Sequence, residues 1–248
     1  TGTISDCKGS AAVVVTAGAN QKPGETRLDL AQKNASVFES MIPEISSFDP
    51  GILLIVTNPV DVLTYLSIQL SNLPPQKIIG SGTVLDTARF RYLIGNHCNV
   101  SPGNVHGYVV GEHGDSEVAM WSQVTIAGQS FDDFYTLPDR DKLKQDITHQ
   151  VKTAAYEIIK RKGATDFAVG MAVVNILSAI MRDENRILTI STLLPKEMEF
   201  GGVCLSVPTI LNANGVSRLV PLKMEGEEKK QFETSVEAVS RSIQSILA

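Results

Sequence analysis

Short hydrophobic runs alternate with segments of helical period over the first third of the chain. Three of these runs are continuous, as in strands buried on both faces: AAVVV (11–15), GILLIVT (51–57) and KIIG (77–80). The segment 28–45 has hydrophobic residues near helical spacing, and a second helix is expected to begin near Val60. Because strands that alternate with crossover helices form parallel sheets, this part predicts a parallel sheet with right-handed connections.

The rest of the chain has a different pattern. Helices are expected over 86–98, 139–162 and 166–181, and a closing helix with an acidic start is expected over 225–248. The hydrophobic runs between them predict strands, some in a mixed or antiparallel sheet, at 104–116, 122–128, 186–194, 203–211 and 216–224. The pattern therefore predicts two halves with a boundary near residue 82.

Composition and charge restrict the class of protein. The 248 residues are 43% hydrophobic and 20% charged, which is typical of a globular protein with a substantial core. The net charge of −5 argues against nucleic acid or an anionic membrane as the main partner. No hydrophobic run reaches the ~18–20 residues that cross a bilayer, and no signal-peptide pattern opens the chain. Three distant cysteines, Cys7, Cys98 and Cys204, are not at metal-ligand spacing, so we expect reduced thiols in a cytoplasmic protein and no metal site.

The stretch GEHGDS (111–116) is the first candidate for chemistry. It places His113 among acidic residues and glycines directly after the hydrophobic run 108–110. The ordinary pKa of histidine, about 6.5, suits a group that takes up and releases a proton near neutral pH. From this stretch alone, a tight turn with a capping histidine is an equally good interpretation.

Asp86 and Arg89 lie three positions apart on an expected helix and can therefore point into one pocket. The planar guanidinium of Arg89 matches a carboxylate through two parallel hydrogen bonds, whereas the alternative is a surface ion pair of little energetic value. Arg91, two positions further on, lies roughly 200° round the helix and is expected outside that pocket. It is either a solvated arginine or part of another site.

Five stretches together carry a family resemblance: TAGANQKPGETRLDL (16–30), TNPVDVLTY (57–65), IIGSGTVLDTARFR (78–91), NVHGYVVGEHGDS (104–116) and KGAT (162–165). In order and spacing they resemble bacterial L-lactate dehydrogenases over essentially the whole chain. The resemblance implies an α/β fold in which the remainder of a Rossmann-type parallel sheet is followed by an α+β substrate domain. It implies the second part of an NAD-binding domain over 1–82 and a substrate domain over 83–248.

The resemblance also implies roles in the NAD-dependent interconversion of L-lactate and pyruvate. His113 would exchange the hydroxyl proton, with Asp86 on its other ring nitrogen, and Arg89 would hold the substrate carboxylate. Arg27 would arrive with closure of the loop 18–27 and stabilise charge on the reacting oxygen. Gln21 is the specificity position, because members that reduce oxaloacetate carry arginine there to pair with the second carboxylate.

Further positions match the family's cofactor and substrate contacts. Thr165 resembles a residue that donates to substrate, although it would also pass as a helix N-cap. Asn58 would bridge substrate and nicotinamide. The other matching cofactor positions are Gly18, Ala19, Ser40, Val56 and Thr57, of which Ser40 is almost as well explained as a plain helix-surface serine.

Arg91 and His106 match an effector site. In members activated by fructose 1,6-bisphosphate, an arginine and a histidine at these positions bind the effector's phosphate at a subunit interface. The resemblance therefore implies allosteric activation, and it also implies a homotetramer. A solvated arginine beside an ordinary strand histidine is the alternative.

One departure from the family is large. The family begins with a strand, a G-x-G-x-x-G turn and a helix, and none of these is in the sequence. GSGTVL (80–85) imitates the turn, but Leu85 stands in place of the third glycine, so we do not interpret it as a phosphate loop. Two alternatives therefore stay open beside lactate dehydrogenase: a malate dehydrogenase of the lactate-dehydrogenase type, which Gln21 argues against, and an inactive fragment that only oligomerises or binds anions. The 248 residues alone are expected to bind NADH poorly.

Overall fold

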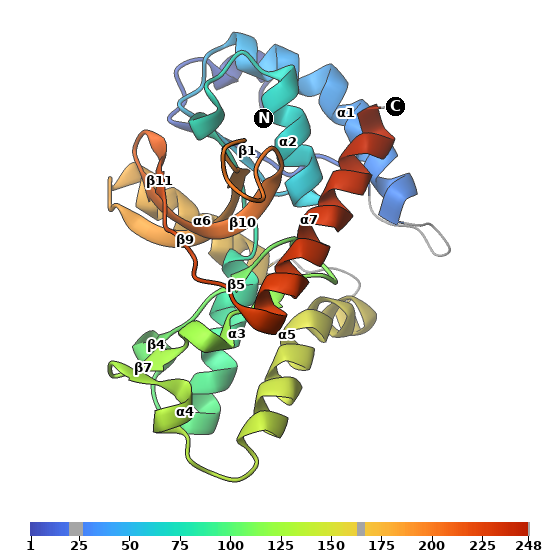
Figure 1. The fold of residues 1–248 in the computed structure, drawn as a ribbon. Coiled ribbons are helices and arrows are strands. Elements are labelled where there is room, and N and C mark those ends of the chain that lie inside the picture. Colours follow the sequence, from blue (N-terminus) through green and yellow to red (C-terminus); the bar gives the residue numbers. More distant parts are fainter. Residues whose placement is uncertain (20–26, 163–166, 248) are drawn as a thin grey trace.

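A six-stranded mixed sheet forms the centre of the molecule, with strand order β1-β2-β3-β9-β10-β11 (Figure 1). The structure is a computed structural model that describes residues 1–19, 27–162 and 167–247, without the side chains of 27–29 and 159–162. A short 3₁₀ helix, Ile4–Cys7, precedes the first strand.

The parallel half of the sheet consists of the three strands predicted from the hydrophobic runs. They are β1 (Ala12–Val15), β2 (Ile52–Ile55) and β3 (Ile78–Gly80). Ala12 pairs with Ile52 and Leu53 pairs with Ile78, both in parallel register. Every residue of β2 and β3 is buried, as their uninterrupted hydrophobic runs predicted. The same expectation is wrong for β1, which lies at the edge of the sheet and buries only Val15 fully.

The antiparallel half comes from the end of the chain and continues the same sheet. It consists of β9 (Arg186–Leu193), β10 (Cys204–Asn212) and β11 (Gly215–Leu219), and β9 pairs with β3 through Gly80 and Ser191. These three strands were expected, but their position beside β3 was not. The sheet therefore extends across the expected boundary near residue 82, and the division into two domains stays a prediction.

Helices cover both faces of the sheet. One face carries α1 (Arg27–Ser47), α2 (Val60–Leu70) and α7 (Gly226–Leu247), with the core residues Phe38 and Leu63 beneath them. The other face carries α6 (Phe167–Met181), which buries Ile176 and Ile180 against β2 and β3. The predicted helices are confirmed, with small differences at their ends.

A second group of elements packs beneath the sheet (Figure 1). Its helices are α3 (Val84–Cys98), α4 (Phe131–Phe134) and α5 (Arg140–Lys162). Its short antiparallel strands are β4 (Val105–His106), β5 (Val109–Val110), β6 (Val118–Ala119), β7 (Thr125–Ile126) and β8 (Gln129–Ser130). Three more 3₁₀ turns occur at Pro75–Lys77, Pro102–Asn104 and Trp121–Gln123. Aromatic rings fill the interior, since Trp121 packs edge-on against Phe90 at 4.8 Å between centroids.

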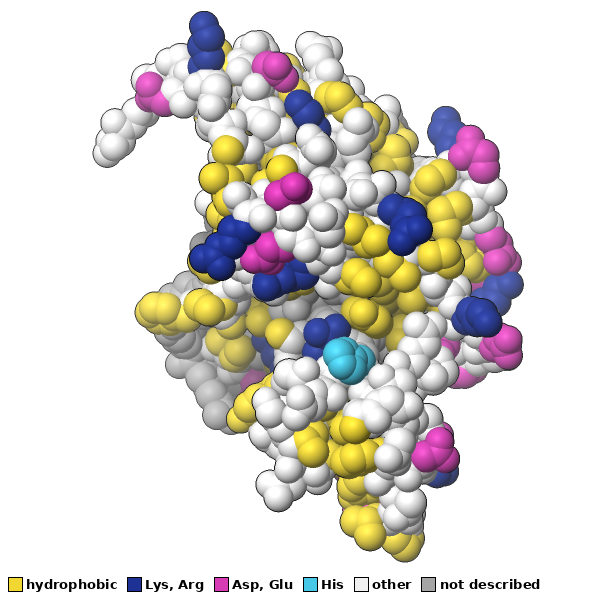
Figure 2. Space-filling model, turned by 90° about the vertical axis from the view of Figure 1, so that its left-hand side faces the viewer, with side chains coloured by type: hydrophobic (Ala, Val, Ile, Leu, Met, Phe, Trp, Pro, Cys, Tyr) yellow, Lys and Arg dark blue, Asp and Glu magenta, His cyan; other side chains and the backbone are white. Residues whose placement is uncertain are grey.

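The surface mixes charged side chains of both signs with hydrophobic patches (Figure 2). Four exposed hydrophobic residues of α6 recur at helical spacing, namely Phe167, Met171, Val174 and Met181. Among the described residues, no helix combines the length and the hydrophobicity that a membrane crossing requires.

The turn from β3 into α3 depends on Gly82. This residue has φ +51°, and a Cβ there would lie 2.5 Å from the Ser191 nitrogen and 2.7 Å from the Thr189 carbonyl oxygen. Both atoms belong to β9, so the glycine lets the turn lie directly against the strand that joins the two halves of the sheet.

We expect Gly82→Ala to lower the free energy of unfolding by about 2–4 kcal/mol, the sum of a left-handed backbone and a clash with β9. The control is Gly128→Ala, at φ +80° with no atom within 4 Å of the added Cβ, which should cost only about 1–2 kcal/mol. Urea unfolding followed by circular dichroism measures both. Equal losses in the two variants would show that the approach to β9 does not matter.

Candidate active site

His113 lies in the loop 111–117, between β5 and β6, and this loop is attached to the central sheet. Gly111 and Ser206 of β10 exchange two backbone hydrogen bonds, of 2.8 and 2.9 Å. Gly111 has φ +91°, a conformation that a glycine adopts at little cost. The sequence GEHGDS therefore leaves its strand abruptly because the glycine turns the chain toward β10.

His113, Asp86 and Arg89 are brought together by this arrangement. Nδ1 of His113 lies 2.7 Å from Oδ2 of Asp86, and Nη1 of Arg89 donates to Oδ1 of the same carboxylate at 3.1 Å. Asp86 and Arg89 come from the start of α3, and their side chains are only 6% and 15% exposed. The pair is therefore not a surface ion pair.

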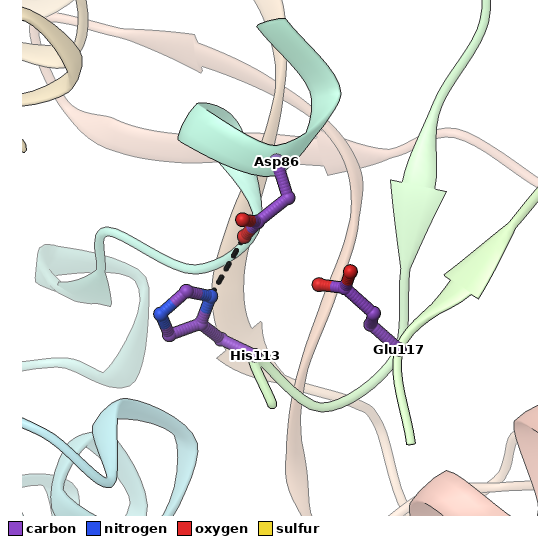
Figure 3. A group of neighbouring side chains, drawn as sticks. All are labelled: Asp86, His113 and Glu117. Atoms are coloured by element: carbon purple, nitrogen blue, oxygen red, sulfur yellow. Dashed lines mark hydrogen bonds and ion pairs between the residues drawn. The ribbon is translucent and has the colours of Figure 1, made fainter. Parts of the chain in front are cut away.

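The imidazole of His113 is 26% exposed, and its second nitrogen points away from Asp86 (Figure 3). Because Asp86 occupies Nδ1, Nε2 is the ring atom that can meet another molecule. A histidine held in this way can pass a proton at Nε2 while the carboxylate stabilises the imidazolium.

The charges of this pair reinforce each other. Burial by itself would lower the pKa of His113, but the charge and hydrogen bond of Asp86, with smaller contributions from Glu117 and Asp61, raise it to about 9. Burial would raise the pKa of Asp86, but the charge and hydrogen bond of His113, together with Arg89, hold it below its usual value. Asp86 is therefore ionised and His113 is cationic at neutral pH.

Asp61 is a site residue that the sequence interpretation missed. It lies in the first turn of α2 and accepts a hydrogen bond from the backbone N–H of His113 at 2.7 Å. Burial raises the pKa of its carboxyl group to about 6, although the hydrogen bond from the His113 N–H acts in the opposite direction. The sequence feature that could have identified Asp61 is its position three residues after Asn58, in the motif TNPVDVLTY.

Glu117 is a second missed residue, four positions after His113. Its side chain is buried. One carboxylate oxygen of Asp86, one of Glu117 and one ring nitrogen of His113 lie within 4.8 Å of one another (Figure 3). Burial, followed by the charge of Asp86, raises the pKa of Glu117 to about 8. The sequence offered no signal for this position beyond its place directly after GEHGDS.

Arg91 faces away from this cluster, as its helical position predicted. Its Nε donates to the Gly107 carbonyl at 2.9 Å, and its guanidinium carbon lies 5.1 Å above the centre of the Tyr108 ring. His106, directly before Gly107 in β4, is exposed. The half-buried Arg91 therefore contacts the two residues that follow His106 in the chain.

Polar groups also gather at the carboxyl ends of β1 and β2. Asn34 of α1 accepts a hydrogen bond from the Ala19 N–H at 2.7 Å and donates one to the Asn58 carbonyl at 2.8 Å. Thr57 donates to the Ala17 carbonyl at 2.8 Å. Asn34, which the sequence interpretation did not select, thus connects the two strand ends where open α/β sheets bind ligands.

Three predicted site residues cannot be placed. Gln21 and Thr165 lie outside the described residues, and of Arg27, the first residue of α1, only the backbone is described. Ser40 is placed on the exposed side of α1, where its hydroxyl donates to the Val37 carbonyl of the same helix at 2.8 Å. Val56 follows β2 and packs partly buried against the core under α6.

Two family models match the chain along nearly its whole length. Residues 1–80 match the lactate/malate dehydrogenase NAD-binding domain, and residues 83–248 match the lactate/malate dehydrogenase alpha/beta C-terminal domain. The chain belongs to the lactate/malate dehydrogenase family. It is therefore an NAD-dependent dehydrogenase, as the sequence motifs predicted.

Individual relatives agree with the family match. An L-lactate dehydrogenase of Synechococcus sp. (strain JA-3-3Ab) is 48% identical over 246 residues, which are 99% of this chain and 80% of the relative. One of Macrococcus caseolyticus (strain JCSC5402) is 50% identical over 96% of this chain and 76% of the relative. The crystal structure of the minor L-lactate dehydrogenase of Enterococcus mundtii in its ligands-bound form superposes with a TM-score of 0.93 at 40% identity, covering 99% of this chain and 79% of that one.

The carboxyl ends of β1 and β2 carry small and polar residues, which suit a dinucleotide bound at this edge of the sheet. A Cβ on Gly18 would lie 2.5 Å from the Thr57 methyl group and 3.0 Å from Asn34 Oδ1, so the glycine lets the chain after β1 pack directly against these two side chains. The segment 80–85 does not offer a phosphate loop, because the Thr83 N–H donates to Thr189 and Ser206 of the sheet. The roles of Gly18, Ala19, Val56, Thr57 and Asn58 toward NAD stay predictions.

We expect Asp86→Asn to lower the free energy of unfolding by about 3–5 kcal/mol near pH 6, since it leaves a buried cation without its partner. The raised pKa of His113 gives stabilisation that is complete below pH 6.5 and lost as the pH rises through about 9. The lowered pKa of Asp86 gives stabilisation that is lost only as the pH falls below its usual value.

Urea unfolding of both proteins at pH 6 and pH 10 tests this window. The difference between them should be largest at pH 6 and clearly smaller at pH 10. A difference that does not change with pH would contradict the ion pair.

Proposed function

We propose that this protein is an L-lactate dehydrogenase that interconverts L-lactate and pyruvate with NAD. The observation that carries the proposal is the buried Asp86–His113 pair with Arg89 beside it, in a chain whose relatives are named L-lactate dehydrogenases. We also propose two functional parts, 1–82 for the cofactor and 83–248 for the substrate, which the ranges of the two family matches support.

His113 performs the proton transfer in this proposal. During oxidation, Nε2 accepts the hydroxyl proton of lactate, and Asp86 stabilises the imidazolium that forms. During reduction, the same atom returns the proton to the carbonyl oxygen. NAD, when bound, supplies the acceptor for the hydride of C2.

Arg89 and Arg27 hold the substrate in this proposal. The guanidinium of Arg89 binds the carboxylate, and Arg27 stabilises charge on the reacting oxygen. Thr165 and Asn58 complete the pocket as hydrogen-bonding groups. Gln21 leaves a second carboxylate without a cation, so dicarboxylates are disfavoured.

Gln21→Arg tests the choice of lactate over malate. We expect the ratio of kcat/KM for oxaloacetate to that for pyruvate to rise by about 100-fold, because a cation then pairs with the second carboxylate. Gln21→Asn, which adds no charge, is the control and should leave the preference for pyruvate. Steady-state assays of the unsubstituted protein come first, and a preference for oxaloacetate at that stage would refute the proposal.

We further propose that fructose 1,6-bisphosphate activates the enzyme through Arg91 and His106. The guanidinium of Arg91 is held by the Gly107 carbonyl and the Tyr108 ring, and His106 adjoins that carbonyl. A cation fixed in this way beside an exposed imidazole is suited to a phosphate group. The alternative of a solvated arginine is less well supported, because Arg91 has these two partners.

Arg91→Gln should abolish activation, because it removes the positive charge that a phosphate group would meet. We expect saturating fructose 1,6-bisphosphate to lower the KM for pyruvate in the unsubstituted protein and to leave the variant unchanged. Arg241→Gln removes an arginine from α7 and should keep the response. Activation that persists in Arg91→Gln would place the effector elsewhere.

We propose a cytoplasmic homotetramer as the working form. The exposed hydrophobic residues of α6 support association of subunits, because such a row is seldom left in water on a monomer. The three cysteines, all free in the structure, support a reducing compartment.

A further inference from the structure

We propose that Glu117 is a positioning residue of the dehydrogenase site: a buried carboxyl group beside Asp86 that is protonated at neutral pH and raises the basicity of His113 once it ionises. Only the effect of Glu117 on the reaction rests on the proposed function. The effect of the Glu117 carboxyl group on the pKa of the His113 imidazole is the same whichever hydroxy acid is the substrate.

The backbone holds Glu117 in place at the base of the site. The residue directly precedes β6, and its N–H donates to the Gly114 carbonyl at 3.3 Å. The carboxyl group points toward the space between Asp86 and His113 (Figure 3). All three groups lie within 4.8 Å, so a charge on Glu117 acts on His113 through little solvent.

The surroundings of Glu117 favour its protonated form. Its Oε1 is buried and has no hydrogen-bond partner among the residues that the structure describes. A charged oxygen left unpaired in such a place is costly, and a bound proton removes the cost. The Asp86 carboxylate is charged instead, because its two oxygens accept hydrogen bonds from His113 and Arg89. The two neighbouring carboxyl groups therefore have opposite protonation states at neutral pH.

The charged groups around Glu117 and His113 come from three helices. Asp86 and Arg89 from α3, Lys152 from α5 and His113 act on Glu117, while Asp61 from α2 acts on His113. The pKa of Glu117, raised to about 8 by burial and by Asp86, lies close to that of His113 at about 9. The two groups therefore titrate over the same range, and each affects the other.

This arrangement has a consequence for the reaction. Below pH 8 a neutral Glu117 adds no negative charge to the site, so His113 is governed by Asp86. Above pH 8 the ionised Glu117 strengthens the hold of His113 on its proton. This favours reduction of the keto acid, which needs protonated His113, over oxidation, which needs the free base.

Glu117→Gln keeps the size of the side chain and fixes it in the uncharged form. We expect the pKa of the His113 imidazole to fall by about one pH unit, as removal of one charge at this distance implies. NMR titration of the imidazole C–H signals measures it in the whole chain, and His113→Asn identifies the signal among the four histidines. Glu112→Gln removes a carboxylate from the same loop and should leave the pKa unchanged. Glu117→Met, neutral and of similar length, should repeat the shift.

Unfolding as a function of pH tests the uncharged state directly. The raised pKa of Glu117 gives stabilisation that is complete below pH 4.5 and lost as the pH rises through about 8. The Tm of the unsubstituted protein should therefore fall relative to that of Glu117→Gln between pH 5 and pH 8. A constant Tm difference over this range would show that Glu117 is already ionised and would overturn the proposal.

The holoenzyme assay supplies the catalytic readout. In Glu117→Gln, the alkaline loss of pyruvate reduction and the acid loss of lactate oxidation should both move to lower pH by the same amount. An unchanged NMR pKa in both neutral variants overturns the inference even if lactate is the substrate. A shifted pKa in a protein that does not act on lactate supports the inference and refutes the proposed function instead.

Discussion

Asp86 and His113 are 27 residues apart in the chain and meet at 2.7 Å, and this charged hydrogen bond is the contact that the site is built around. It fixes which imidazole nitrogen faces outward, keeps Asp86 ionised in a buried position and orients Arg89 through the second carboxylate oxygen. Without it, three polar side chains would be buried at high cost. With it, they form a site that can hold a carboxylate and move a proton.

The fold supplies the rigidity that this contact requires. Helix α3 starts where β3 ends, at the point where β3 meets β9, so Asp86 is anchored to the middle of the sheet. The loop of His113 is bound on one side to β10 through Gly111 and Ser206, and on the other side to α2 through Asp61. Segments from the parallel and antiparallel halves thus position the same imidazole, and the single sheet gives the site its precision.

The local sequence pattern was sufficient to predict most helices and strands, because each has its own hydrophobic period and its own residues that mark an end. The hydrophobic runs at β1, β2 and β3, and the helix that ends at Lys162, could be predicted without information from elsewhere in the chain. The position of β9 beside β3 was not predicted, because its hydrophobic run fits any buried neighbour. Asp61 and Glu117 were missed for a related reason: a lone acid in a motif looks like an ordinary polar residue until its burial is known.

The sequence by itself determined the order of the elements, the family and the identity of His113, Asp86 and Arg89 as candidates, because residue type and spacing carry that information. Only the tertiary structure decided how they act on one another. The pKa values depend on burial and on charges that arrive from α2, α3 and α5. Desolvation and Coulomb energies are functions of distance in space, and separation along the chain does not fix that distance.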